Sequence, residues 1–304
     1  MIIDRPGPVT DRITLLGRTE SCVYLVKGDL EYAVLGGGLA YIAPEVLAQL
    51  EAFQVDQEKI KRLIVHHTHF DHVGIVPFLR KRWPWLKVMA SARGREQLAR
   101  REVVATIIAF SQALLAQKGL TGRLGEFGLD PDGFQIDETA PDGGSISLGG
   151  LTLRFIYTPG HSSCSMAVYI PEEKVLSASD GGGIPFGDRV FASANSNFDQ
   201  YQESLVKMAG LDVQIHLAEH YGARTGEDGR SFLARSIESA RLTRSALEES
   251  YARTRDEEKT VEELSSLLAG EASGYFLPQE VMDLVLRQMT RFIARKHNAV
   301  KRGG

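Results

Sequence analysis

The sequence predicts a layered α/β fold, because short β-rich segments alternate with helical segments over most of its length. The β-rich segments contain many Val, Ile, Leu and Tyr residues, and most of them end at glycine or proline. The helical segments repeat their apolar residues at three- and four-residue spacing. Beyond residue 224 only helical segments follow. We therefore predict an α/β domain over residues 1–224 and a helical C-terminal extension over residues 225–304.

Nine segments have the composition and length of strands. They are ITLLG (13–17), CVYLVKG (22–28), YAVLGGG (32–38), KRLIVHH (61–67), LKVMAS (86–91), LTLRFIYTPG (151–160), MAVYIP (166–171), and the β-rich starts of KVLSASDGGG (174–183) and QIHLAEHYG (214–222). The glycine runs 36–38 and 181–183 lack the Gly-Lys-Ser/Thr of a phosphate loop. We interpret both as tight turns that let a substrate approach the backbone.

Helices are expected between and after these strands. The predicted helices are 42–53, 76–83, a long helical insert at about 95–118 that stops at Gly119, 197–208 with Asn197 or Asp199 as its cap, 230–254, 260–270 and 277–296. Thr260 and Glu263 have the spacing of a capping box, and Pro278 suits a first helical turn.

Composition and charge exclude several classes of function. The chain has 304 residues, 43% of them hydrophobic and 24% charged, with a net charge of -4 and a pI of about 6.1. Without a basic excess, neither a nucleic acid nor an anionic membrane is an expected partner. The chain has no apolar run of the roughly 18–20 residues that a membrane span needs, and the start MIIDRPGPVTDR does not resemble a signal peptide. The expected location is cytoplasmic.

A cluster of histidines follows one predicted strand. The stretch VHHTHFDHVG (65–74) places His67, His69, Asp71 and His72 in the turn after a buried strand, where open α/β sheets form their sites. Imidazole and carboxylate groups at this spacing are typical of metal ligands. His66 alternates to the other face of the strand end, so we expect it to support the ligands or pack in the core.

These four side chains are too few to bind two metal ions without further ligands. Three more candidate ligands follow other predicted strands. They are His161 in TPGH, Asp180 in SASDGGG and His220 in AEHYG, and His216 on the same strand is the rival of His220.

The ordered set HxHxDH, TPGH, a strand-terminal Asp and a late strand-terminal His resembles the metallo-β-lactamase fold superfamily over roughly residues 10–224. The resemblance implies an αββα sandwich, here with a helical insert and a helical C-terminal appendage. It also implies that His67, His69 and His161 hold one metal, that Asp71, His72 and His220 hold a second, and that Asp180 bridges them. His220 is preferred over His216 because it lies past the strand, although the usual Gly-His-Gly turn here is AEHYG.

The implied chemistry is hydrolysis by a hydroxide shared by two divalent metals, with Asp71 orienting it and moving its proton. Zinc and iron suit the ligands best, with manganese as a further candidate. The chain most resembles the branch with glyoxalase-II-like hydrolases and the 2-aminobenzoylacetyl-CoA thioesterase. A small ester, thioester or related substrate is therefore expected. The alternatives are a phosphodiesterase and a regulatory binding protein that keeps its metals.

The helical segments outside the α/β body carry apolar stripes. We expect the insert (Val103, Ile107, Phe110, Leu114) and the tail (Leu284, Leu286, Met289, Phe292, Ile293) either to cover the metals as a substrate-selecting lid or to pack on the body. A tail that is no lid would be an interaction surface, for instance for a homodimer.

Overall fold

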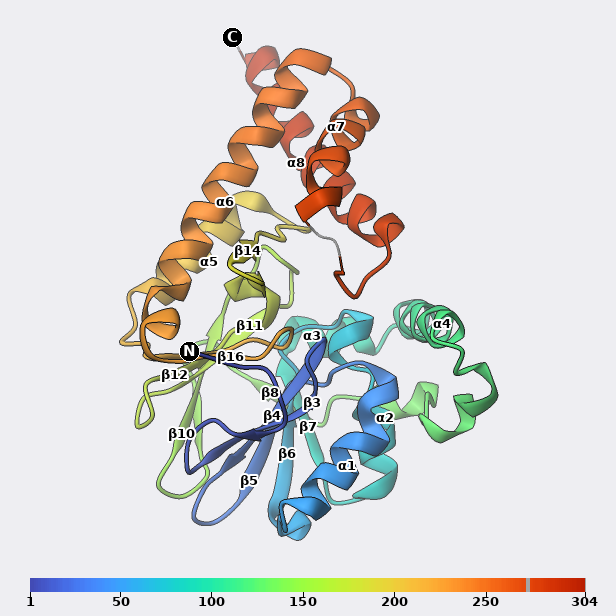
Figure 1. Cartoon of the computed structure of the whole chain (residues 1–304), viewed down its shortest axis with the longest axis vertical. Coiled ribbons are helices and arrows are strands. Elements are labelled where there is room, and N and C mark those ends of the chain that lie inside the picture. Colours follow the sequence, from blue (N-terminus) through green and yellow to red (C-terminus); the bar gives the residue numbers. More distant parts are fainter. Residues whose placement is uncertain (272–273, 304) are drawn as a thin grey trace. The chain divides into compact units, whose positions relative to one another are not determined.

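The computed structural model describes the backbone of residues 1–271 and 274–303 and the side chains of residues 1–267 and 274–298 (Figure 1). The chain forms two compact units. Unit 1 comprises residues 1–157, 164–179 and 212–230, and unit 2 comprises residues 158–163, 180–211 and 231–304. The functional boundary after residue 224 stays a prediction.

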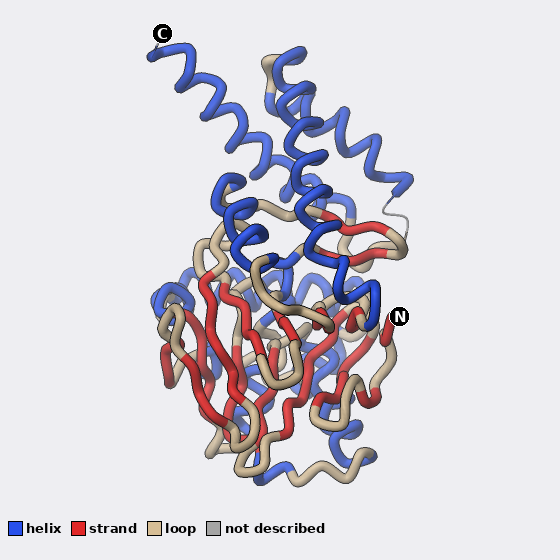
Figure 2. The backbone as a smooth tube through the Cα atoms, turned by 90° about the vertical axis from the view of Figure 1, so that its left-hand side faces the viewer, coloured by secondary structure: helices blue, strands red, loops and turns tan. Residues whose placement is uncertain are grey.

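Unit 1 contains two seven-stranded sheets (Figure 2). The first has the order β2-β3-β4-β5-β6-β7-β8, antiparallel from β2 to β5 and parallel from β5 to β8. The parallel pairing brings the carboxyl ends of β5, β6 and β7 to one edge. The strand bounds are β2 (Gly7–Pro8), β3 (Ile13–Arg18), β4 (Ser21–Lys27), β5 (Tyr32–Leu35), β6 (Ile60–Ile64), β7 (Lys87–Ser91) and β8 (Glu138–Ala140).

The second sheet has the order β1-β16-β15-β12-β11-β10-β9, in which β12 and β15 are parallel and the other neighbours antiparallel. Its strands are β1 (Ile2–Ile3), β9 (Ser145–Ser147), β10 (Thr152–Tyr157), β11 (Met166–Ile170), β12 (Val175–Ser177), β15 (Ile215–Leu217) and β16 (Ala223–Arg224). The short strands β1, β2, β8, β9 and β16 were absent from the sequence-based prediction.

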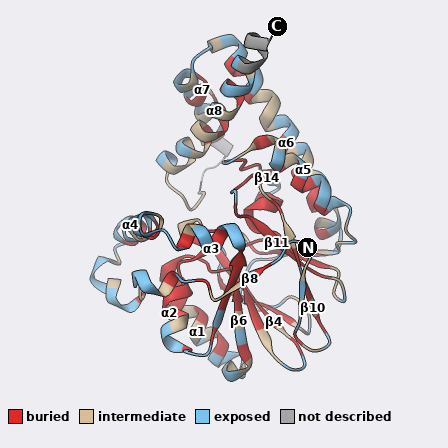
Figure 3. Ribbon diagram, turned by 180° about the vertical axis from the view of Figure 1, so that it is seen from behind, coloured by how far each residue is buried: buried red, intermediate tan, exposed pale blue. Residues whose placement is uncertain are grey.

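The core of unit 1 lies between the two sheets. A single buried cluster joins Leu15 and Tyr24 of the first sheet to Phe155 and Val168 of the second. Figure 3 shows the buried residues concentrated along these strands. Strands that alternate apolar residues therefore bury one face in a shared core, as a sandwich requires.

The helical elements of unit 1 include α1 and α3, which pack on β3 and β7 of the first sheet. They are η1 (Ala40–Ile42), α1 (Ala43–Ala52), η2 (Gln57–Lys59), η3 (Phe70–His72), α2 (Val76–Arg82), α3 (Ala92–Leu98), α4 (Arg101–Gln117), η4 (Thr121–Glu126) and η5 (Pro131–Phe134). The insert is two helices rather than one, because Arg100 has extended backbone at the start of α4. The insert ends close to the predicted stop at Gly119, whose φ is +71°.

Unit 2 contains a short hairpin and long helices. Its elements are β13 (Ile184–Phe186), β14 (Arg189–Phe191), α5 (Phe198–Ala209), most of α6 (Gly226–Thr254), α7 (Glu257–Glu271) and α8 (Gln279–Gly303), and η6 (Ser179–Gly182) begins at the last residue of unit 1. Asn197 caps α5, because its side chain accepts a hydrogen bond from the Gln200 amide. Among the described helices, none is long and apolar enough to cross a membrane.

The predicted capping box at Thr260 and Glu263 is wrong. The α7 helix begins at Glu257, and the Asp256 carboxylate accepts hydrogen bonds from the amides of Glu258 and Lys259. Thr260 instead donates to the Asp256 carbonyl. Two overlapping signals competed here, and the aspartate that lies earlier in the chain caps the helix.

Candidate metal centre

The histidine cluster lies on the loop that leaves the carboxyl end of β6. His67, Asp71 and His72 are buried there. The glycine run 36–38 packs against this loop: the Gly74 amide donates to the Gly38 carbonyl at 2.7 Å, and a Cβ on Gly37 would lie 2.4 Å from the His72 carbonyl. Gly37 and Gly38 therefore pack directly against the donor loop, and the approach of a substrate to this turn stays a prediction.

The inner atoms of these side chains converge. His72 Nε2 lies 3.2 Å from His220 Nε2, and Asp71 Oδ2 lies 3.5 Å and 3.6 Å from these two nitrogens. His67 Nε2 lies 3.1 Å from His69 Nδ1. Donors placed tetrahedrally at 2.0–2.1 Å from a zinc ion are about 3.3 Å apart. The spacing of these donors therefore fits a metal ion.

The outer nitrogens of the same rings face hydrogen-bond acceptors. His220 Nδ1 lies 2.7 Å from the Glu20 carbonyl oxygen, and His72 Nδ1 lies 2.8 Å from Glu219 Oε2. A carbonyl oxygen cannot donate, so the His220 Nδ1 must carry the proton. A carboxylate also only accepts, so His72 Nδ1 donates its proton to Glu219 Oε2.

These outer contacts fix the protonation of the inner atoms. A neutral imidazole protonated on Nδ1 has a lone pair on Nε2. Two such lone pairs and the Asp71 carboxylate therefore face one another in a buried space. Without a cation the three acceptors repel each other, and a divalent ion among them would satisfy all three. The residues present thus fit the metal that their spacing predicted.

Unit 2 carries two further predicted donors in the same arrangement. His161 Nδ1 lies 2.7 Å from the Ser193 carbonyl oxygen, which leaves Nε2 as the acceptor. That Nε2 lies 3.5 Å from Asp180 Oδ2. Both side chains are buried. The inner atoms of this pair are also set for a cation.

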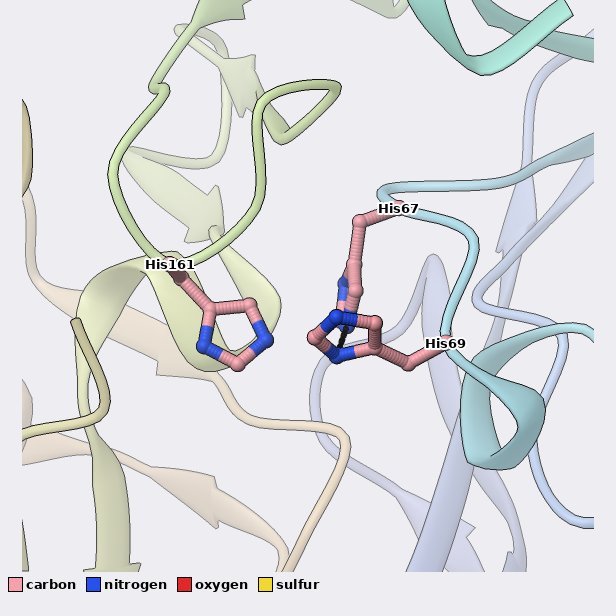
Figure 4. Close-up of side chains that lie close together, drawn as sticks. All are labelled: His67, His69 and His161. Atoms are coloured by element: carbon pink, nitrogen blue, oxygen red, sulfur yellow. Dashed lines mark hydrogen bonds between the residues drawn. The ribbon is translucent and has the colours of Figure 1, made fainter. Parts of the chain in front are cut away.

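The donor atoms form three groups, in each of which one ligand atom per residue lies within 4.8 Å of the others. The groups are His67 with His69 and His161, His67 with His72 and Asp180, and Asp71 with His72 and His220. Figure 4 shows the first group. All seven residues predicted as ligands occur in at least one group, and their assignment to individual metal ions stays a prediction.

The remaining histidines differ in their surroundings. His216 is buried within β15 and belongs to none of these groups, and burial followed by the charge of Arg224 lowers its pKa to about 3. His66 Nδ1 lies 2.9 Å from Glu219 Oε1. His297 is half-buried, with its ring centroid 5.8 Å from that of Tyr251.

Two supporting residues had no clear signal in the sequence. Ser179 precedes Asp180 with a φ of +48°, and its Oγ lies 3.4 Å from His67 Nδ1 and 3.3 Å from His72 Nδ1. Glu219 has an ordinary identity for a surface residue, and only its place beside His220 marks it. Such roles depend on tertiary contacts that no local pattern encodes.

The family model of the metallo-β-lactamase superfamily matches residues 16–220, about two-thirds of the 304 residues. The chain belongs to the metallo-β-lactamase superfamily. The fold class predicted from the sequence is thereby confirmed, including the helical C-terminal region. Its His/Asp cluster is of the kind that could hold a metal ion.

Similar proteins include a probable metallo-hydrolase of Burkholderia pseudomallei, 24% identical over 49% of this chain and 43% of the relative. A hydroxyacylglutathione hydrolase of Rhodopseudomonas palustris is 24% identical over 60% of this chain and 56% of that protein. The chain thus spans about half the length of these curated relatives. A metallo-β-lactamase family protein from Thermus thermophilus has the same fold, with a TM-score of 0.60 at 20% identity over 97% of this chain and 92% of the other.

Proposed function

We propose that the chain is a dinuclear metal-dependent hydrolase acting on a small ester or thioester. His67, His69 and His161 would hold one divalent metal, Asp71, His72 and His220 the other, and Asp180 would bridge them. The proposal is carried by one observation: the outer nitrogens of His72, His161 and His220 face acceptors, so their inner nitrogens are free of protons.

A pair of divalent cations, when bound, lowers the pKa of a water toward neutrality and stabilises negative charge on the carbonyl under attack. Asp71 has a second task in this proposal. Its carboxylate borders the His72 and His220 nitrogens, where it can orient the attacking water and accept its proton. The reaction then needs no serine or cysteine nucleophile.

The substrate class is supported by the surroundings of the donor loop. Phe70 lies between His69 and Asp71, and its ring stacks on Phe110 of α4 at 5.5 Å between centroids. Phe110 is 38% exposed. Apolar surface next to the donors suits an acyl or aryl group. Two of the similar proteins are named hydroxyacylglutathione hydrolase, which favours a thioester among the candidates.

The test is a combined metal and substrate assay. Protein loaded with zinc, iron or manganese should bind two equivalents and hydrolyse at least one of an acyl-CoA, a glutathione thioester and a lactone, in preference to a phosphodiester. Asp180→Ala should lose metal and lower the rate to background, because it removes a shared anionic ligand. His297→Ala is the matched control and should change neither.

The outcomes separate the alternatives. Two bound equivalents with no hydrolysis of any substrate would favour a regulatory binding protein, and hydrolysis of the phosphodiester alone would favour a phosphodiesterase. An Asp180→Ala protein that keeps both metals and its full rate would remove the bridge from the proposal. Metal content near zero in protein purified without chelator would overturn the ligand assignment altogether.

A further inference from the structure

Glu219 is a buried carboxylate placed directly before the predicted ligand His220. Its side chain is 1% exposed, and each of its oxygens faces a different imidazole of the donor loop. Oε1 lies 2.9 Å from His66 Nδ1, and Oε2 lies 2.8 Å from His72 Nδ1. A carboxylate buried this deeply is costly unless such partners compensate it. Its position is therefore specified by the surrounding residues.

Gly36 provides the space for this carboxylate. Its φ is +89°, and a Cβ at this position would lie 2.8 Å from Glu219 Oε2 and 2.9 Å from its Cδ. Any side chain here would displace the carboxylate from His72 or strain the backbone. Three segments far apart in the sequence, at residue 36, residues 66–72 and residue 219, thus meet around one charge.

The acceptor of His72 differs from those of the other anchored ligands. His220 and His161 face the backbone carbonyls of Glu20 and Ser193, which are neutral. His72 faces a full negative charge. A carboxylate behind an imidazole fixes its tautomer and increases the basicity of the nitrogen that binds the metal. The site that includes His72 should therefore bind its cation more tightly than the same ligands would without the carboxylate behind His72.

We propose that Glu219 is a positioning residue that orients His72 and strengthens the metal site formed by Asp71, His72 and His220. The absence of a side chain at Gly36 leaves room for its carboxylate. The inference rests on the proposed function for its ligand set. It concerns metal affinity rather than turnover, so the two can fail separately.

The experiment compares metal affinities by competition with a chelator, using zinc as the probe. His72→Ala first identifies the equivalent that depends on His72. Glu219→Gln keeps the shape but loses the charge, and it should weaken that same equivalent about 10- to 100-fold while leaving the other unchanged. Glu219→Asp should restore part of the affinity. Glu51→Gln, an exposed glutamate of α1, is the control and should behave as wild type.

A second pair of variants keeps the test decisive if Glu219→Gln fails to fold. Gly36→Ala adds a methyl group against the carboxylate and should weaken the same equivalent. Gly143→Ala introduces a side chain at a similar φ of +74°, where nothing lies within 4 Å, and should not. Unchanged metal affinities in Glu219→Gln or Gly36→Ala, with only a lower melting temperature, would overturn the inference. A wild-type protein without hydrolase activity, but with the affinity difference, would overturn the proposed function alone.

Discussion

The donor loops of unit 1 and the helices of unit 2 both contain many charged side chains, but they use them in opposite ways. Around the cluster, Glu219 and His72 form a pair whose side chains are 1% and 0% exposed. On α6, the Arg241–Glu238 pair is 58% and 55% exposed, and the Arg287–Glu258 pair of α8 and α7 is 30% and 59% exposed. Because the Glu219–His72 pair is buried, water cannot replace either partner when it is lost.

This difference indicates where function can be found in the molecule. An exposed ion pair contributes about 0–1 kcal/mol, so its residues can change with little effect. A buried charge that loses its partner costs about 3–5 kcal/mol. Such a group persists when other residues have been arranged around it, as Gly36 is around Glu219. The polar residues of the donor loops are therefore the ones whose replacement should report on chemistry.

The largest effect is expected from the two histidines near the end of β15. His220→Ala removes a donor that faces His72 and Asp71, so one metal equivalent should be lost and hydrolysis should fall to background. His216→Ala removes a buried ring outside the donor groups, so it should lower stability and leave both equivalents bound. Metal analysis of the two purified variants makes the comparison, and the reverse pattern would reassign the ligand.

The two regions also differ in how far the sequence predicted them. The strands that form the sandwich were recognisable because apolar β-rich runs ended at glycine or proline, and the long helices because their apolar residues repeat. Strands of two or three residues, such as β9, carry too few residues for a pattern. The break between α3 and α4 at Arg100 was missed because the residues on both sides of it favour a helix.

The predicted donors are marked by local sequence, whereas the residues behind them are not. His67, His69, Asp71 and His72 lie in one motif, and His161, Asp180 and His220 each follow a β-rich run, so local sequence marks them. Glu219 and Ser179 contact His72, which lies more than 100 positions away from each of them in the sequence. Ser179 also has a left-handed backbone that its residue type does not favour, so nothing local could have indicated it.

A smaller effect is expected from acid on the buried histidine of β15. The pKa of His216 is lowered from 6.5 to about 3, so the folded chain resists its protonation while the unfolded chain does not. The contribution of neutral His216 to the free energy of unfolding is fully present above about pH 6.5. It is lost as the pH falls from 6.5 toward 3, at about 1.4 kcal/mol per pH unit. Between pH 6.5 and 5 this amounts to about 2 kcal/mol. Urea unfolding of wild type and His216→Gln should show that the free energy of unfolding depends less on pH in the variant. The same pH dependence in both proteins would show that His216 is not its source.

The smallest effect on the metals is expected from the helices of unit 2. On α8, Leu286, Met289 and Ile293 are buried, whereas Leu284 is 37% exposed. Most of the predicted apolar stripe is therefore buried within the helical packing, and the lid remains a proposal for its exposed residues.

Deleting residues 278–304 should leave metal content near that of wild type, because the deletion removes none of the seven donors, but should raise the KM for an apolar acyl substrate. Leu284→Ser tests the same idea without removing the buried face of α8, and it should raise KM less, with kcat unchanged. If both proteins fold, bind two metals and keep the wild-type KM and substrate range, the tail is an interaction surface, and analytical ultracentrifugation of the same proteins should then show a dimer of the full chain that the deletion dissociates.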